Sequence, residues 1–212
     1  MPQKKVTLGA IIALLVVAAA GILYFAKSRD GALKTFAPRI PQSQTQLDLS
    51  ERGLSKVPMD IFSKTALEIL DLSGNNLTGA LPAEIRHLQN LKFLDASNNN
   101  MTGIPAEIGQ LGNLETLNYG ENKIDTMPDE IANLKKLTHL SLAKNTYRSI
   151  PAKILEIKSL QILDFSYNKL TSVPAGIAGL KNLTELNLIG NPIPKSAIRT
   201  LKARMPHAAI LF

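Results

Sequence analysis

The sequence of 212 residues contains no cysteine, no tryptophan and only three histidines. Without cysteine, the chain cannot form disulfides, iron–sulfur clusters, Cys-ligated zinc sites or a cysteine nucleophile. His87, His139 and His207 lie in three different parts of the sequence and leave little material for a histidine metal site. We therefore expect no metal site and no cofactor.

A basic stripe for phosphates is also missing, although the net charge is +7. Residues 1–43 carry +5, residues 44–194 carry −2 and residues 195–212 carry +4. The large middle segment is slightly acidic and the positive excess lies at the two ends. This distribution argues against a nucleic-acid partner.

One long apolar run is present near the N-terminus. Residues 6–26 contain no charged side chain and, as a helix, would be about 31 Å long, which matches the hydrocarbon core of a bilayer. This length predicts a single-pass transmembrane signal-anchor helix between a basic tail (1–5) and a tether (27–43). A cleaved signal peptide and a buried helix of a soluble protein are the alternatives.

The orientation of this segment depends on the flanking charges, which are nearly balanced. Lys4 and Lys5 precede it, and Lys27 and Arg29 lie after it. The balance of Lys and Arg leans slightly toward a cytoplasmic C-terminal part, whereas two lysines before an apolar run are typical of a signal-anchor that exports the C-terminal part of the chain. We expect the rest of the chain on the exported side, periplasmic or extracellular, with the cytosolic side as the alternative.

Residues 44–194 contain one pattern repeated seven times. Its first leucine recurs at intervals of 24, 23, 23, 23 and 23 residues, at Leu67, Leu91, Leu114, Leu137, Leu160 and Leu183. The pattern reads L-x-x-L-x-L-x-x-N-x-L and continues as apolar-Pro-x-x-Ile-x-x-Leu. Its asparagines are Asn75, Asn99, Asn122, Asn145, Asn168 and Asn191. Residues 195–212 depart from the pattern and predict a cap of one amphipathic helix and one strand.

These residues resemble the leucine-rich repeat family in its 23-residue class, and the single 24-residue unit around Gly79 and Leu81 is similar to the plant-receptor variant. The resemblance implies an α/β solenoid, curved, with a parallel β-sheet on its concave face and turns or short helices on its convex face. It also implies protein–protein interaction. A repeat of this kind cannot bury its leucines alone, so the units must stack and the ends need caps.

The pattern has a physical basis. The leucines at positions 4 and 6 of each repeat unit point inward from a short strand, and the side chains at positions 3 and 5 face the concave side. The asparagine turns the chain out of the strand, and its amide can bond backbone groups of neighbouring coils as a structural ladder. The proline fixes φ and favours a tight turn or short helix.

The concave face is predicted to be acidic with two apolar spots. Ile69 and Phe93 should touch across adjacent strands, and Ile162 with Tyr167 makes a smaller spot. The candidate binding residues are Ile69, Asp71, Phe93, Asp95, Asn118, His139, Ser141, Ile162, Asp164 and Tyr167. They favour a protein or peptide partner with basic and apolar side chains. Alternatively, the aspartates belong to the scaffold.

An enzyme is not expected. His139, Ser141 and Asp164 could be drawn as a triad, but the face is open and nothing supplies an oxyanion hole or a strained nucleophile turn. The sequence therefore predicts a membrane-anchored, non-catalytic recognition module. The alternatives are an envelope protein that binds glycan or its own copies and a cytosol-facing scaffold.

Overall fold

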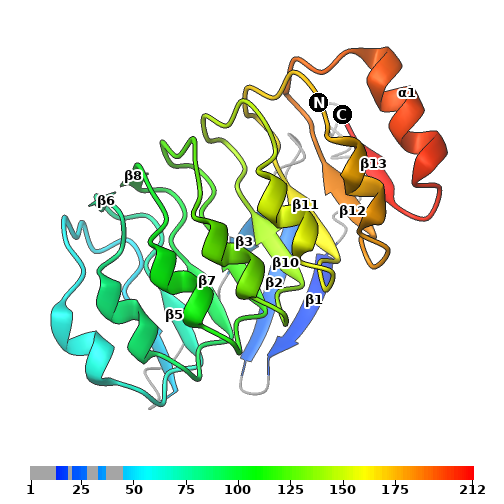
Figure 1. Ribbon diagram of the computed structural model, residues 1–212. Coiled ribbons are helices and arrows are strands. Elements are labelled where there is room, and N and C mark those ends of the chain that lie inside the picture. Colours follow the sequence, from blue (N-terminus) through cyan, green and yellow to red (C-terminus); the bar gives the residue numbers. More distant parts are fainter. Residues whose placement is uncertain (1–12, 19–20, 28–32, 37–44) are drawn as a thin grey trace, which may run out of the picture.

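The computed structural model describes residues 13–18, 21–27, 33–36 and 45–212. Residues 45–212 form a curved solenoid of stacked coils (Figure 1). Each coil contributes one short strand to an eight-stranded parallel sheet with the order β13-β12-β11-β10-β9-β7-β5-β4. Its strands are β4 (Gln46–Asp48), β5 (Ile69–Asp71), β7 (Phe93–Asp95), β9 (Thr116–Asn118), β10 (His139–Ser141), β11 (Ile162–Asp164), β12 (Glu185–Asn187) and β13 (Ala209–Leu211). The predicted solenoid with a parallel sheet is confirmed.

Short 3-10 helices line the convex side. They are η1 (Met59–Ser63), η2 (Ala83–His87), η3 (Ala106–Gln110), η4 (Asp129–Asn133), η5 (Ala152–Glu156) and η6 (Ala175–Gly179). Each begins directly after the proline of its repeat, whose φ between −56° and −73° suits the first turn of a helix. One further pair of two-residue strands, β6 (Thr78–Gly79) and β8 (Asn100–Met101), joins the 24-residue unit to the next.

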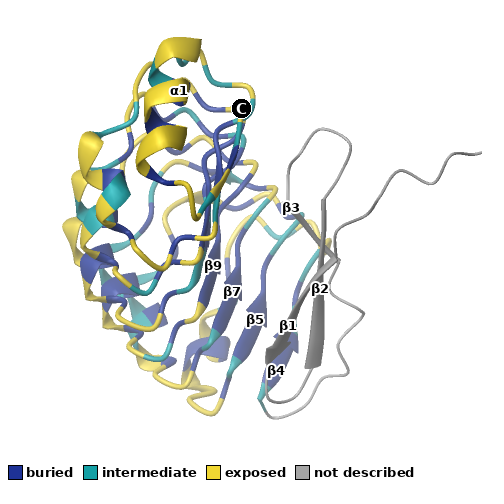
Figure 2. Cartoon of the chain, turned by 90° about the vertical axis from the view of Figure 1, so that its right-hand side faces the viewer, coloured by how far each residue is buried: buried dark blue, intermediate teal, exposed yellow. Residues whose placement is uncertain are grey.

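The C-terminal end is covered by helix α1 (Lys195–Arg204), followed by β13. Ile198, Leu201 and Met205 of this segment are buried and belong to the core. That core is one continuous apolar cluster from Leu47 to Ile210 between the sheet and the 3-10 helices. Figure 2 shows the buried strands and the exposed outer turns.

The asparagine of each repeat bonds two coils together. In the fifth repeat, Asn145 donates from Nδ2 to the carbonyl oxygens of Tyr119 (2.8 Å) and Leu142 (3.2 Å), and its Oδ1 accepts from the Ile124 N–H (2.9 Å). Asn75, Asn99, Asn122, Asn168 and Asn191 make equivalent bonds. Buried backbone groups that would otherwise lack partners are satisfied in this way.

The N-terminal apolar segment differs from the expectation. In place of a helix over 6–26, the described residues form an antiparallel pair, β1 (Ala13–Ala18) and β2 (Gly21–Lys27), and β3 (Leu33–Phe36) comes next, within the expected tether. A continuous apolar run rich in Val, Ile, Leu and aromatic residues suits a strand as well as a helix. In the part of the chain that the structure describes, no helix is long and apolar enough to cross a membrane. Residues 1–12 lie outside the described residues.

One buried hydroxyl in the core lacks a hydrogen-bond partner among the described residues. Tyr119 occupies the inward position that is leucine or phenylalanine in most repeats, and its fully buried hydroxyl has no hydrogen-bond partner among the described residues. We expect Tyr119→Phe to raise the free energy of unfolding by about 1–2 kcal/mol, because an orphaned buried hydroxyl costs that much. Chemical denaturation measures the change.

The matched control is Tyr147→Phe. The Tyr147 hydroxyl donates to the carbonyl oxygen of Thr126 at 3.0 Å, so this variant should lose about 1 kcal/mol. Equal destabilisation by both variants would contradict the assignment of the Tyr119 hydroxyl as a group without a hydrogen-bond partner.

Candidate functional site

The concave side of the sheet carries two columns of side chains in register. One column, at position 3 of each repeat, contains Gln46, Ile69, Phe93, Thr116, His139, Ile162 and Glu185. The other, at position 5, contains Asp48, Asp71, Asp95, Asn118, Ser141, Asp164 and Asn187. Because the strands are parallel and in register, neighbours within a column are about 4.8 Å apart. The structure therefore brings together nine of the ten candidate binding residues on this face.

The apolar members of the first column are more buried than the sequence predicts. Ile69 is 1% exposed, Phe93 is 2% exposed and Ile162 is 6% exposed. None of them belongs to the core cluster, because their side chains point to the opposite face of the sheet. Each has a neighbour on both adjacent strands, which accounts for part of the shielding. The expected exposure of Phe93 and Ile69 is therefore wrong, although their pairing across β5 and β7 is present.

The aspartates of the second column are tied to the backbone. The Oδ1 atom accepts the N–H two residues later in Asp48 (from Ser50, 2.9 Å), Asp71 (from Ser73, 2.8 Å) and Asp95 (from Ser97, 2.8 Å). Asn118, Asp164 and Asn187 make the same bond. This local turn ends the strand, and it explains why asparagine can replace aspartate at this position. It supports a scaffold role for one oxygen of each carboxylate.

Three carboxylates nevertheless lie side by side on β4, β5 and β7. Burial raises the pKa of Asp71 to about 6, the neighbouring carboxylates of Asp95 and Asp48 add to the rise, and the bonds from Ser73 oppose it. Asp95 accepts a second bond at Oδ2 from the Asn118 amide (3.0 Å). This end of the concave face is therefore strongly acidic and would attract a basic group.

The raised pKa of Asp71 has a measurable effect on stability. Between the ordinary pKa of 3.8 and about 6, Asp71 binds more protons in the folded state than in the unfolded state, so its contribution to stability is highest below pH 4 and falls until about pH 6. We expect Asp71→Asn to abolish this fall and to stabilise the protein at pH 7 by about 1–3 kcal/mol. Asparagine keeps the acceptor for Ser73, as Asn118 shows for Gly120.

Thermal unfolding of both proteins from pH 4 to pH 8 tests this expectation. Asp125→Asn, which removes a carboxylate from an exposed site on an outer turn, is the matched control and should not stabilise the protein at pH 7. If the unfolding temperature changes with pH in the same way in Asp71→Asn and in the unaltered protein, the expected effect of Asp71 is refuted.

His139 and Asp164, two of the residues that could be drawn as a triad, each make a hydrogen bond to another group. His139 Nδ1 lies 2.8 Å from the hydroxyl of Thr138, its own neighbour, and burial lowers the pKa of His139. Asp164 uses Oδ1 for the Ser166 N–H. In the described part of the chain, no group of three His, Cys, Asp or Glu side chains could hold a metal ion.

Position 8 of the repeat requires a left-handed backbone, which the leucine and asparagine pattern did not reveal. Glu51, Asn98, Glu121, Lys144 and Tyr167 all have φ between 51° and 56° there. The glycines at the same position in two other repeats, Gly74 and Gly190, were the available signal. The half-exposed ring of Tyr167 lies against Gly190, where an added Cβ would be 2.6 Å from the ring. Tyr167, three residues after the end of β11, is the candidate binding residue that lies outside the two columns.

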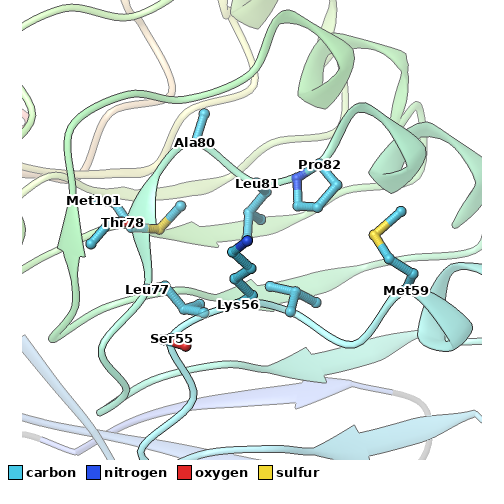
Figure 3. Close-up of a pocket in the computed structure, with 10 residues that line it drawn as sticks. Ser55, Lys56, Met59, Leu77, Thr78, Ala80, Leu81, Pro82 and Met101 are labelled. Carbon is cyan, nitrogen blue, oxygen red and sulfur yellow. The ribbon is translucent and has the colours of Figure 1, made fainter.

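A separate apolar hollow of about 300 Å³ lies away from the two columns, next to the 24-residue unit (Figure 3). It is lined by Ser55, Lys56, Val57, Met59, Leu77, Thr78, Ala80, Leu81, Pro82 and Met101. In Figure 3 the side chain of Lys56 extends toward Leu81 across this hollow. Several of its walls are core side chains with little exposed surface, so we regard the concave face as the stronger candidate site.

Comparisons with known proteins agree with this geometry. Residues 62–147 match the family model described as a leucine-rich repeat region, and residues 158–202 match one for two copies of leucine-rich repeats. The human volume-regulated anion channel subunit LRRC8A is 38% identical over 82 residues, which cover 38% of this chain and 10% of that protein.

Solved structures are similar over more of the chain. A leucine-rich repeat protein of Leptospira interrogans has a TM-score of 0.68 and 32% identity, with 79% of this chain and 48% of that chain covered. The ectodomain of the Arabidopsis receptor kinase HAESA, solved with an IDA peptide hormone, has a TM-score of 0.57 and 30% identity over 65% of this chain and 24% of that chain. The chain thus spans about half the length of the Leptospira protein and a small part of the HAESA ectodomain and of LRRC8A. With its repeated leucines, asparagine ladder and parallel concave sheet, the chain belongs to the leucine-rich repeat family.

Proposed function

We propose that this protein recognises a protein or peptide segment with basic and apolar side chains through its concave face, without catalysing a reaction. The observation that carries the proposal is the pairing of Ile69 with Phe93 on β5 and β7, directly beside the carboxylates of Asp71 and Asp95. Because Ile69 and Phe93 are almost fully shielded in this structure, an apolar side chain of the partner would have to take the place of the layer over them, and a cationic one would approach the carboxylates. The peptide bound by the HAESA ectodomain supports this class of partner.

The rigid form of the face favours binding. Its strands are held by the ladder and by the Oδ1 bonds of the aspartates, so little conformational entropy is lost on the side of the solenoid.

Selection from a displayed library of random peptides tests the proposal. We expect the full chain to enrich peptides that combine Arg or Lys with large apolar residues. Phe93→Ser should lower the affinity for the selected peptides about tenfold or more. Phe93→Leu should retain binding because it keeps an apolar side chain at this position. Met59→Ser, at a 54% exposed apolar residue outside the concave face, is the control.

Equal binding by Phe93→Ser and the unaltered protein, with both folded by circular dichroism, would refute the concave site. Capture of glycans, or self-association of the chain without peptide enrichment, would favour the adhesive alternative instead.

The proposal also includes a single-pass membrane anchor formed by residues 6–26, with the repeats on the exported side. It rests on the 21 uncharged residues of this segment. Within a bilayer the segment would be a helix, because backbone groups there must be satisfied inside the segment, unlike the strands β1 and β2 of the structure.

A further inference from the structure

Three lysines form a row along one edge of the solenoid. Lys135, Lys158 and Lys181 are 23 residues apart, and each lies in the exposed loop between a 3-10 helix and the following strand. Since one repeat corresponds to one step along the stack, they lie above one another at intervals of about 5 Å. Lys136 lies beside Lys135 and is also exposed. We call these four residues the basic edge.

Three of the four lysines of the basic edge donate hydrogen bonds to neutral groups. Lys135 Nζ donates to the Ala132 carbonyl oxygen (2.5 Å) and Lys158 Nζ to the Leu155 carbonyl oxygen (2.6 Å). Lys136 Nζ donates to Asn113 Oδ1 at 2.8 Å. These bonds orient the amines without neutralising their charges.

Acidic groups do little to offset this charge. Glu156 lies close enough to Lys135 and Lys158 for their charges to lower its pKa, but its ion pair is with Lys153 at 2.9 Å. Along the same edge, the preceding repeats have uncharged residues at the equivalent positions, namely Gln89, Asn90, Gly112 and Asn113. Positive charge is therefore concentrated on the C-terminal half of one edge, although residues 44–194 together carry −2.

We propose that the basic edge docks on the surface of an anionic phospholipid bilayer. The inference rests on the membrane attachment proposed above. A tether of 17 residues spans at most about 60 Å, so it keeps the edge within reach of the lipid. A straight row of cations fits a flat anionic surface, and an edge-on position leaves the concave face open to a partner. The proposal thus assigns an orientation to the solenoid on the membrane.

The absence of cysteine allows a direct test with the full chain carrying one fluorescent label. Gly112→Cys places the label in the same column as Lys135, where an added Cβ meets no atom within 4 Å. Ser172→Cys places it on an exposed outer turn of another part of the coil. Energy transfer to a headgroup acceptor is measured in vesicles of phosphatidylcholine alone or with phosphatidylglycerol.

We expect strong transfer from position 112, and not from 172, only when phosphatidylglycerol is present, and its loss at high salt. Lys135→Gln, Lys158→Gln and Lys181→Gln together should weaken docking about a hundredfold, since each cation near an anionic surface contributes roughly fivefold. The control replaces three exposed lysines elsewhere, Lys56, Lys123 and Lys169, by glutamine and should retain docking.

Equal transfer with and without phosphatidylglycerol, or no effect of the triple variant, would overturn the proposal while leaving the anchor intact. Binding of soluble polyglutamate through the edge, without docking on the vesicles, would overturn it in favour of an acidic protein partner. If the chain fails to float with pure phosphatidylcholine vesicles, the anchor is refuted. Salt-sensitive flotation with phosphatidylglycerol would then still support the basic edge.

Discussion

Replacing Asn145 by alanine is expected to lower the free energy of unfolding by about 3–5 kcal/mol. The variant removes the acceptor of the buried Ile124 N–H and the donor to the carbonyl oxygens of Tyr119 and Leu142. Each buried polar group left without a partner costs about 1–3 kcal/mol. Asn145 is 6% exposed, so water cannot readily replace the lost bonds.

The position of Asn145 in the stack adds a second effect. In a repeat protein each unit is stabilised only by its neighbours, so a weak junction in the middle can separate unfolding into two steps. We expect urea denaturation, monitored by circular dichroism, to show an earlier and broader transition than that of the unaltered protein.

The control is Asn113→Ala on the exposed edge. The Asn113 side chain donates to the Gln89 carbonyl oxygen (2.9 Å) and accepts from Lys136 Nζ (2.8 Å). Because both bonds lie at the surface, where water can replace them, the loss should stay near 1 kcal/mol or below. Similar losses in the two variants would show that the ladder is no more important than a surface hydrogen bond.

A change from membrane to soluble fractions is the second large effect that we expect. Leu15→Arg with Val16→Arg places two cations in the middle of residues 6–26. Each costs about 2.5–3.5 kcal/mol at the centre of a transmembrane helix, so the pair should shift membrane insertion by several orders of magnitude. Carbonate extraction of membranes from expressing cells, with detection by immunoblotting, measures the change.

Thr171→Arg with Ser172→Arg adds the same charge at exposed positions of the repeats and should leave the chain in the membrane fraction. Recovery of the unaltered chain in the soluble fraction would refute the anchor, with β1 and β2 then describing this segment in solution. A shortened mature chain by mass spectrometry would identify a cleaved signal peptide instead.

Reporters fused after Phe212 then decide the orientation. Activity of an enzyme that works only after export supports the proposed side. Fluorescence of a cytoplasmic reporter would support the cytosol-facing scaffold and exclude binding to external glycans.

Much of the fold can be predicted from residues that recur in the sequence. The leucine pattern returns after 24 residues at this point of the chain, which places Ile69 beside Phe93 and Asp71 beside Asp95, because stacked repeats bring equal positions into register. The prolines predicted the start of the 3-10 helices because their φ is fixed. These features depend on local geometry and on the period, which a single sequence contains.

Other features arise only when the coils are assembled. The shielding of Phe93 and the raised pKa of Asp71 depend on what surrounds them in space, and the strands β1 and β2 depend on pairing that a uniform apolar run does not specify. The sequence by itself determined the repeat, its register and the ladder, since these depend on spacing along the chain. Tertiary structure decided the burial of the concave side chains and the protonation of Asp71, because both depend on neighbours that are distant in sequence.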